Sequence, residues 1–198
     1  MECRKLTVFD SSQIVRIHKL AFNNFFLTQL GYFFLNTYYR SSLKDKNCVV
    51  VGIFKEHDLL GFAIGTILSR GYHSRLLKRS FFKFLLSVII IIFTNPKAVL
   101  RLKNNMDKNA NPDDDGNYAE LLSIGIDPLY SGKGLGSILI KEFENNVLKM
   151  EGKTITLTTD KNDNEYVISF YKKHGYTLFY EFIAYPNRKM LKLIKNLQ

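Results

Sequence analysis

A glycine-rich turn constrains this chain more than any other feature of its sequence. Gly132, Gly134 and Gly136 fall within five residues. An apolar run at 118–126 precedes them, and a helical pattern that reaches Val147 follows. Such a turn at the start of a helix leaves free backbone N–H groups at the positive end of the helix dipole, which favours phosphate binding. The sequence therefore predicts a strand, a phosphate-binding turn and a helix at the centre of the fold.

Two common phosphate-binding motifs do not fit this turn. A dinucleotide-binding unit would carry Gly-x-Gly-x-x-Gly early in the chain and an acidic residue about 20 residues further on. Here Gly136 closes the run, Ser137 follows it, and the turn comes late in the chain. A Walker loop would end in Gly-Lys-Ser or Gly-Lys-Thr, which is not the case here. Taken alone, the turn is a general phosphate site.

The rest of the chain supplies further strands and helices around this unit. In order, the patterns predict a strand at 4–9, a helix after Asp10, two helical pieces divided at Gly31, a hairpin of 49–55 and 59–68, a strand at 154–159, a helix at 164–174, and strands at 176–184 and 189–194. The unit from 119 to 159 should form a right-handed crossover between parallel strands. We expect one domain over residues 1–198.

Cysteine content and the N-terminal sequence bear on the compartment. The chain has two cysteines, Cys3 and Cys48, with no metal or redox spacing and no disulfide framework. The first residues, MECRKLTVFD, contain no apolar segment of the kind found in signal peptides. We therefore expect a reducing, cytoplasmic location, with membrane association left open by the segment described next.

The segment 69–117 interrupts the alternating pattern and carries most of the excess positive charge. Between Arg70 and Lys108 there are nine lysines and arginines and a single acid, Asp107, in a chain of net charge +10. Its apolar run at 84–93 is too short to span a membrane, which takes about 20 residues. Three alternatives remain: a helix packed on the protein or on a second copy, a helix at a membrane surface, or a strand built on its four isoleucines.

Two motifs together resemble a known family. The stretch LLSIGIDPLYSGKGLGSILI is similar to the acyl-CoA-binding motif of the GNAT N-acetyltransferases, Gln/Arg-x-x-Gly-x-Gly/Ala. Gly134 and Gly136 match its small positions, whereas Ser131 stands where the family usually has Gln or Arg.

The second motif, NEYVISFYKKHGY, is similar to the family's Asn-x-x-Ala-x-x-x-Tyr-x-x-x-Gly-Phe helix. Asn164, Tyr171 and Gly175 are in register with it, while Val167 replaces Ala and Tyr176 replaces Phe. The resemblance covers the chain outside the insertion 69–117. It implies an α/β (α+β) single-domain GNAT fold, with a mixed, mostly antiparallel central sheet of about six to seven strands flanked by helices. The insertion would be helical and would precede the central strand.

The resemblance also implies acetyl-CoA as the cofactor. Backbone N–H groups of the glycine turn would hold its pyrophosphate, with Lys133 adding charge at the rim. The pantetheine arm would lie along the central strand, where Gly125 would help to open a gap beside the neighbouring strand. The residues expected to bind the cofactor are Ser123, Ile124, Gly125, Ile126, Ser131, Gly132, Lys133, Gly134, Leu135, Gly136, Ser137, Asn164 and Tyr171.

Acetyl transfer to an amine requires a proton to leave the amine and another to reach the thiolate. The resemblance makes Tyr171 the candidate acid and Glu120, at the start of the central strand, the candidate base. The alternatives are a core tyrosine, and a water chain in place of the glutamate. Asn164 would bind the cofactor or orient its helix, or act only as an N-cap. His18, on an apolar helix face, is more typical of a core residue than of a catalytic one.

The acceptor is expected to be a small primary amine, with an amino sugar favoured. Aromatic side chains of the early helices suit a sugar ring, and we expect Phe25, Phe26 and Tyr32 to contact the acceptor together with Glu120. The alternative is a protein on a GNAT frame that acts at a membrane surface or as a homodimer through 81–93, with weak or no catalysis. Nucleic acid is not expected as a partner because no binding motif is present, and no residues have metal-ligand spacing.

Overall fold

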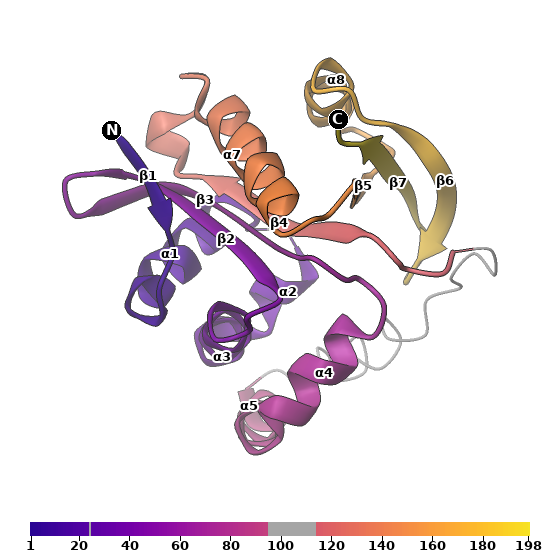
Figure 1. Ribbon diagram of the computed structural model, residues 1–198. Helices are drawn as coiled ribbons and strands as arrows, with labels where there is room; N and C mark the ends of the chain where they lie inside the picture. The colour runs from indigo at the N-terminus through magenta and orange to yellow at the C-terminus, as the bar shows by residue number, and fades with distance from the viewer. Residues whose placement is uncertain (24, 95–113) are drawn as a thin grey trace.

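The computed structural model describes residues 1–23, 25–94 and 114–198, and its strands form one sheet (Figure 1). Within these residues the sheet has seven strands in the order β1-β2-β3-β4-β5-β7-β6. Only β4 and β5 are parallel neighbours, and the other neighbours are antiparallel. The mixed, mostly antiparallel α/β fold is therefore confirmed. The strands are β1 (Glu2–Lys5), β2 (Cys48–Lys55), β3 (Asp58–Thr66), β4 (Ala119–Ile126), β5 (Thr154–Asp160), β6 (Thr177–Ala184) and β7 (Arg188–Asn196).

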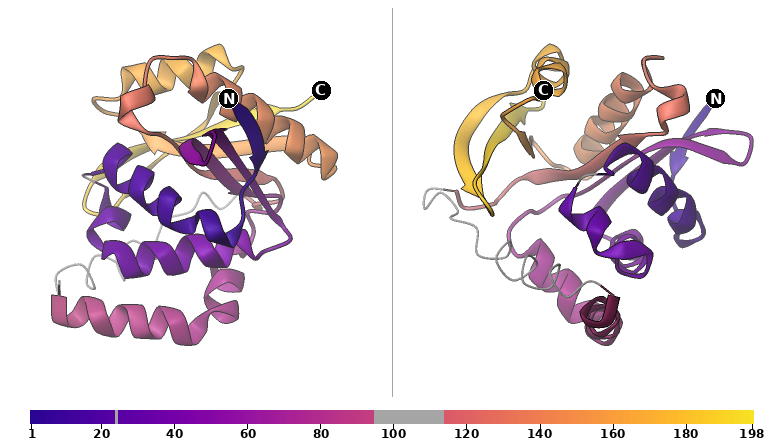
Figure 2. Two further views of the ribbon diagram at one scale, coloured as in Figure 1. Left: turned by 90° about the vertical axis from the view of Figure 1, so that its left-hand side faces the viewer. Right: turned by 180° about the vertical axis from the view of Figure 1, so that it is seen from behind.

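Helices cover both faces of the sheet, as the two turned views make plain (Figure 2). The helices α1, α2 and α3 lie on one face, and α7 and α8 lie on the other. Apolar side chains of each layer meet the sheet in separate clusters, one built around Ile14, Tyr39 and Phe62 and one around Leu139 and Phe143. The helices of these layers are α1 (Ser11–Ala21), α2 (Phe26–Gln29), α3 (Gly31–Leu43), α7 (Leu135–Lys149) and α8 (Glu165–Lys173).

The parallel pair β4 and β5 separates soon after it forms. Its pairing runs only from Ala119 to Leu121 on β4, opposite Ile155–Leu157 on β5. On the other side of β4, the register with β3 shifts, because Gly65 pairs with Leu121 and Ile64 with Ser123. Leu122 is thus the extra residue of a β-bulge, which bends the strand and lets its distal half diverge from β5.

The position of this irregularity corrects one expectation. We expected Gly125 to mark it, but Gly125 pairs in regular register with Phe62. A Cβ atom at Gly125 would lie 3.2 Å from ring atoms of both Phe22 and Phe62. Its lack of a side chain therefore serves close packing against α1 and β3 rather than the opening of the sheet.

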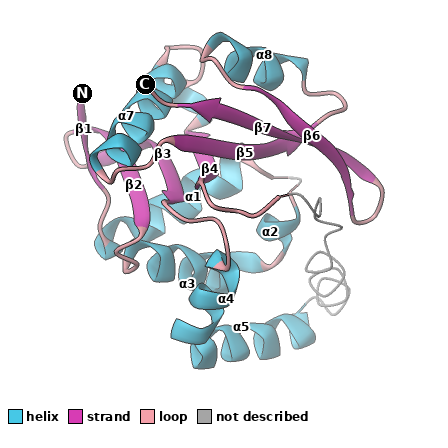
Figure 3. Ribbon diagram, turned by 45° about the vertical axis from the view of Figure 1, so that its right-hand side comes forward, coloured by secondary structure: helices cyan, strands magenta, loops and turns pink. Residues whose placement is uncertain are grey.

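The described part of the insertion forms two helices, α4 (Tyr72–Arg79) and α5 (Phe81–Thr94), which lie beyond α3 on the outside of the molecule (Figure 3). The isoleucine run lies within α5, so the strand alternative is wrong. Residues 95–113 of the insertion lie outside the described part of the chain. Among the helices that the structure describes, none is both long and apolar enough to cross a membrane.

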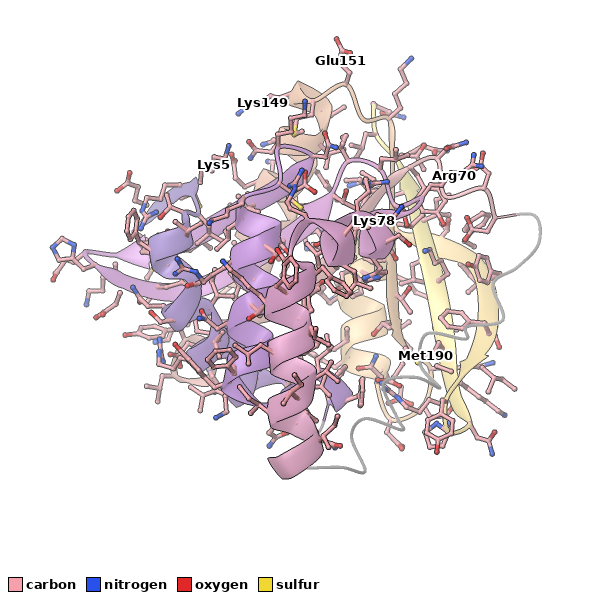
Figure 4. The ribbon with its side chains drawn as sticks, turned by 90° about the horizontal axis from the view of Figure 1, so that it is seen from below. Lys5, Arg70, Lys78, Lys149, Glu151 and Met190 are labelled. Carbon is pink, nitrogen blue, oxygen red and sulfur yellow. The ribbon has the colours of Figure 1, made fainter. Side chains whose placement is uncertain are left out.

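Helix α5 has one buried face and one exposed apolar face. Phe84, Ser87 and Ile91 are buried toward α3, where the rings of Phe84 and Phe34 lie 5.5 Å apart. Seen from below, α5 runs in front of the sheet, and Lys78 of α4 lies near its start (Figure 4). One face of the helix therefore packs on the protein as expected, and the opposite face is exposed at Phe82, Leu85, Leu86, Ile89 and Ile92.

Candidate active site

A cavity of about 670 Å³ lies where β4 separates from β5. Its walls come from both faces of the sheet. The residues of α1 to α3 include His18, Phe22, Phe25, Tyr38 and Tyr39, and the opposite wall includes the glycine turn and the α8 residues Tyr166, Val167, Phe170 and Tyr171. The cavity therefore passes through the gap in the sheet and joins the two helical layers.

The glycine turn forms one end of this cavity. Gly132 and Gly134 both have left-handed backbone conformations, with φ of 73° and 76°, which favour glycine. Apart from the adjoining residues, no described part of the chain lies within 4 Å of the position a Cβ would take at either residue, so the space beside the turn is open. Gly134 is the N-cap of α7, and the free N–H groups of the helix start there. This geometry suits a phosphate group.

Most of the residues expected in the turn line the cavity, with one exception. Ser131, Gly132, Gly134, Leu135, Gly136 and Ser137 are all part of its wall. Lys133 is not, and its ammonium nitrogen lies instead 5.0 Å from the centre of the Tyr130 ring. Lys133 thus lies outside the cavity wall, beside the turn, and can act on a phosphate only through its charge at the rim.

The distal half of β4 forms a long side of the cavity. Ser123, Ile124 and Ile126 line it, while Gly125 does not. In the described part of the chain, β4 has no ladder partner on its β5 side beyond Leu121. Its backbone N–H and C=O groups on that side can therefore pair with an extended ligand, as an added strand would.

Two residues of the second motif lie on the wall opposite β4. Tyr171 is buried, and burial raises the pKa of its phenol, so that the hydroxyl keeps its proton at neutral pH. Asn164 donates to the Thr159 hydroxyl at 2.7 Å and to the Asp160 carbonyl at 2.9 Å, and makes no side-chain bond to cap α8. Asn164 therefore fastens the start of α8 to the end of β5 while also lining the cavity.

Glu120 lies in a second, smaller cavity of about 280 Å³. Its carboxylate accepts hydrogen bonds from the Lys192 ammonium, at 3.0 Å, and from the Ser69 hydroxyl. The structure does not bring Glu120 and Tyr171 into one cavity, although Thr158 lines both cavities. The second cavity is otherwise lined by Arg70, His73, Asp114, Asp115, Gly116, Tyr118, Tyr180 and Phe182.

The aromatic residues expected at the acceptor are separated by the structure. Phe25 lines the larger cavity, and the Arg188 guanidinium lies 5.4 Å from the centre of its ring. Phe26 packs against the core on the α1–α3 side, and Tyr32 is exposed on α3. Neither Phe26 nor Tyr32 lines either of the two cavities.

A hydrogen-bonded chain of three side chains was missed from the sequence. His18 Nδ1 lies 2.7 Å from the Tyr39 hydroxyl, which lies 3.2 Å from the Ser123 hydroxyl, and all three residues line the larger cavity. Burial lowers the pKa of His18 to about 4. The helical pattern places His18 on a buried face, but no local signal in the sequence links it to Tyr39 or to Ser123.

Comparisons with known proteins agree with this geometry. The model of the acetyltransferase (GNAT) family matches residues 13–176. No curated protein matches the chain.

Several solved structures share the fold. The ribosomal-protein-S18-alanine N-acetyltransferase from Escherichia coli is 14% identical, with a TM-score of 0.64 over 100% of this chain and 94% of that one. The PaiA N-acetyltransferase from Thermoplasma acidophilum, in complex with coenzyme A, is 16% identical, with a TM-score of 0.56 over 99% and 98%. The polyamine N-acetyltransferase from Drosophila melanogaster is 12% identical, with a TM-score of 0.62 over 99% of each chain.

Proposed function

The chain belongs to the acetyltransferase (GNAT) family, and from this premise we propose that it transfers the acetyl group of acetyl-CoA to the primary amine of a small acceptor by direct attack in a ternary complex. Members of this family are acyltransferases that use acetyl-CoA. The observation that carries the proposal is the cavity at the gap between β4 and β5, which has a phosphate-binding turn at one end and Tyr171 in its wall. This arrangement joins cofactor binding and proton donation in one space.

The residues present fit acetyl-CoA, which would supply an activated acetyl thioester. The open space beside Gly132 and Gly134 and the start of α7 suit the pyrophosphate. The unpaired edge of β4 at 123–126 suits the amide groups of the pantetheine arm. Ser131, which replaces the family's usual Gln or Arg, removes one side-chain contact but leaves the backbone donors of the turn in place.

Tyr171 is proposed to donate a proton to the departing sulfur. Its buried phenol is neutral at working pH, because burial raises its pKa, and its side chain lines the cavity. Positioning the two reactants in this narrow gap would supply much of the rest of the rate increase.

Glu120 is proposed to take the proton that leaves the ammonium form of the acceptor. Its cavity adjoins the larger one at Thr158, so a proton would pass through at least one water molecule. The Lys192 ammonium lies 3.0 Å from the Glu120 carboxylate and would hold it in position. A water chain without Glu120 is the alternative.

The acceptor is proposed to be an amino sugar that enters from the side of the second cavity. Tyr118, Tyr180 and Phe182 line this cavity, and aromatic rings are the side chains on which a sugar can stack. Lys192, Glu120 and Asp114 offer charged groups that can bond its hydroxyls. Phe25, on the larger cavity, would close the acceptor's other side.

A panel of amines tests the function and the acceptor class together. Release of free thiol from acetyl-CoA would be followed with glucosamine, glucosamine 6-phosphate, tyramine, spermidine and a short peptide with a free N-terminus. We expect the highest kcat/KM for one of the two amino sugars. Highest activity with spermidine or the peptide would overturn the acceptor class, and no acetylated product from any amine would overturn the proposed function.

A second candidate function is contact with an anionic membrane surface through α5. The observation that favours it is the exposed apolar stripe of Phe82, Leu85, Leu86, Ile89 and Ile92, in which Phe82 is 83% exposed. Five basic residues precede or flank the stripe, and of these Arg79 is paired with Asp45 at 3.3 Å: Arg70, Arg75, Lys78, Arg79 and Lys83. An apolar helix face with adjacent positive charge is typical of helices that lie in a membrane interface. A second copy of the chain is the competing occupant.

The location is proposed to be the cytoplasm, where this contact would bring the enzyme to a membrane. The two cysteines, Cys3 and Cys48, have no disulfide framework in the sequence, which supports a reducing compartment.

A further inference from the structure

The chain of His18, Tyr39 and Ser123 connects α1, α3 and β4 across the cavity wall. His18 is 4% exposed, Tyr39 is fully buried, and both rings pack edge to face at 5.6 Å. Ser123 is the first residue after the bulge, where β4 begins to part from β5. The Nε2 atom of His18 is buried without a hydrogen-bond partner in the described structure. A buried polar atom without a partner is costly, so this one calls for an explanation.

The direction of the hydrogen bonds follows from the chemistry of the three groups. At neutral pH the His18 ring and the Tyr39 phenol are both neutral, because burial lowers the pKa of the first and raises that of the second. A phenol is the stronger donor and an imidazole nitrogen the stronger acceptor, and the 2.7 Å separation matches an O–H···N bond from Tyr39 to His18 Nδ1. The ring proton of His18 then lies on Nε2.

This direction determines the role of the serine. Because the Tyr39 hydroxyl proton is committed to His18, its oxygen accepts from the Ser123 hydroxyl at 3.2 Å. The Ser123 oxygen, which lies beside the gap in the sheet, has already donated its proton and can only accept further hydrogen bonds. A group that fills this position must present an N–H or O–H donor, as a primary amine does.

We propose that Ser123, Tyr39 and His18 form a relay that holds the acceptor amine by an N–H group and carries one proton away from its nitrogen as the amide forms. The inference rests on the proposed function and deepens it. Ser123 would touch the substrate, while Tyr39 and His18 would act through it as positioning residues.

The proposed proton transfers leave every member of the relay uncharged. The amine nitrogen bonds to the acetyl carbon, the bond from that carbon to sulfur breaks, and the sulfur takes its proton from Tyr171. The nitrogen passes a proton to the Ser123 oxygen, Ser123 passes its own to Tyr39, and Tyr39 passes its own to Nδ1 of His18. Nε2 then releases its proton to a water molecule that reaches it from the cavity, and water returns a proton to Tyr171, so His18 changes tautomer but stays neutral and Tyr171 regains its hydroxyl.

Nitrogen-15 NMR of the imidazole rings tests the hydrogen-bond direction without any acceptor. The chain has four histidines, and a His18→Gln variant identifies the signal of His18. At pH 7 we expect neutral His18 with its proton on Nε2. In Tyr39→Phe we expect the Nδ1 signal to move toward that of a nitrogen with no donor bound to it. A proton on Nδ1 in the wild type would overturn the relay.

Steady-state kinetics with the most active amine of the panel test whether the relay takes part in turnover. We expect Tyr39→Phe and Ser123→Ala each to lower kcat about tenfold, and the double variant to be no slower than either, because both break the same relay. The proton inventory in mixed light and heavy water should be curved for the wild type and linear for Tyr39→Phe. An unchanged inventory would mean that the three side chains serve only to hold the fold together.

Tyr72→Phe is the matched control for this experiment. Tyr72 is also a buried tyrosine whose hydroxyl bonds a serine, Ser42, at 2.8 Å, but it does not line the cavity. We expect its kcat and inventory to match the wild type. If no amine is turned over, the proposed function fails, and the NMR result alone then supports or overturns the hydrogen-bond order.

Discussion

Tyr171 is buried, which keeps its phenol protonated, and it lines the cavity. A group that donates a proton to the sulfur of the thioester needs both properties. Tyr171→Phe removes the hydroxyl and keeps the ring. We expect kcat to fall about a hundredfold, because the thiolate would leave without a proton. The affinity for acetyl-CoA, measured by calorimetry, should change little. The control is Tyr176→Phe, whose buried ring lies 5.7 Å away and does not line the cavity. Equal turnover in Tyr171→Phe and wild type would exclude Tyr171 as the acid.

Glu120 is tested by its amide counterpart. Glu120→Gln keeps the shape of the side chain but cannot take a proton, so we expect kcat to fall and the acidic limb of the pH–rate profile to disappear. Glu144→Gln is the matched control, because Glu144 is also shielded from solvent and paired with a lysine, Lys195, at 2.7 Å. If the acidic limb persists in Glu120→Gln, the base is water or another residue.

His18 links the site to the pH dependence of folding. Its pKa is about 4 in the folded protein and about 6.5 when unfolded, so between these values the unfolded chain binds more protons. The free energy of unfolding should therefore fall by up to about 3 kcal/mol from pH 6.5 to pH 4, and be unaffected by His18 at higher pH. Urea titrations of wild type and His18→Gln at pH 6.5 and pH 4 measure how much of this loss of unfolding free energy is due to His18. Equal losses in both proteins would contradict the assignment.

Residues whose role is local were predictable from the sequence, and residues joined by tertiary contact were not. Gly132 and Gly134 were identified from their spacing alone, because a turn that opens a helix is a local feature. Glu120 was identified by resemblance, but its partner Lys192 is 72 residues away and no pattern links the two. The link from His18 to Ser123 through Tyr39 also depends wholly on packing between layers.

At the scale of elements, periodicity predicted the strands and helices well, since their apolar faces repeat along the chain. The first strand is an exception: 4–9 was expected, whereas β1 is Glu2–Lys5 and Val8–Asp10 is a short 3-10 helix. The sequence places the irregularity of β4 at Gly125, because glycine is the usual sign of an irregular strand, whereas the bulge lies at Leu122, which carries no such sign. The run of isoleucines is helical in spite of its β propensity, because α3 offers it a face to pack on.

The exposed stripe of α5 gives the prediction at this scale. Replacing Phe82, Leu86 and Ile89 together with Gln removes large apolar side chains without touching the buried face of the helix. We expect the wild type to sediment with vesicles of phosphatidylcholine and phosphatidylserine, and the triple variant to stay in solution.

A second triple variant serves as its control. Leu20, Leu148 and Leu178 are similarly exposed but lie on other elements, and their replacement by Gln should leave sedimentation unchanged. If the wild-type protein stays in solution at both low and high vesicle concentrations, binding of α5 to a membrane surface is excluded. Concentration-dependent dimers that the α5 variant abolishes would identify a second copy as the occupant.

At the scale of the whole molecule, the sheet separates two helical layers, and a cavity at the gap between β4 and β5 is lined by residues of both. The layer of α7 and α8 provides the glycine turn and Tyr171, and the layer of α1 to α3 provides His18, Tyr39 and Phe25. Groups from both layers face one space at this gap, which is why we propose that the acetyl group is transferred there. The second cavity, which we propose for the acceptor, was the least predictable part, because it is built from segments far apart in the chain.

Binding of acetyl-CoA to wild type and to Gly134→Glu tests this account most directly. A glutamate at Gly134 would place a side chain in a left-handed position and a negative charge in the phosphate turn. Lys149→Glu, at the other end of α7, is the matched control. By calorimetry we expect wild type and the control to bind acetyl-CoA alike, and Gly134→Glu to bind at least about a hundredfold more weakly, close to 3 kcal/mol. Equal binding by Gly134→Glu and wild type would contradict the account.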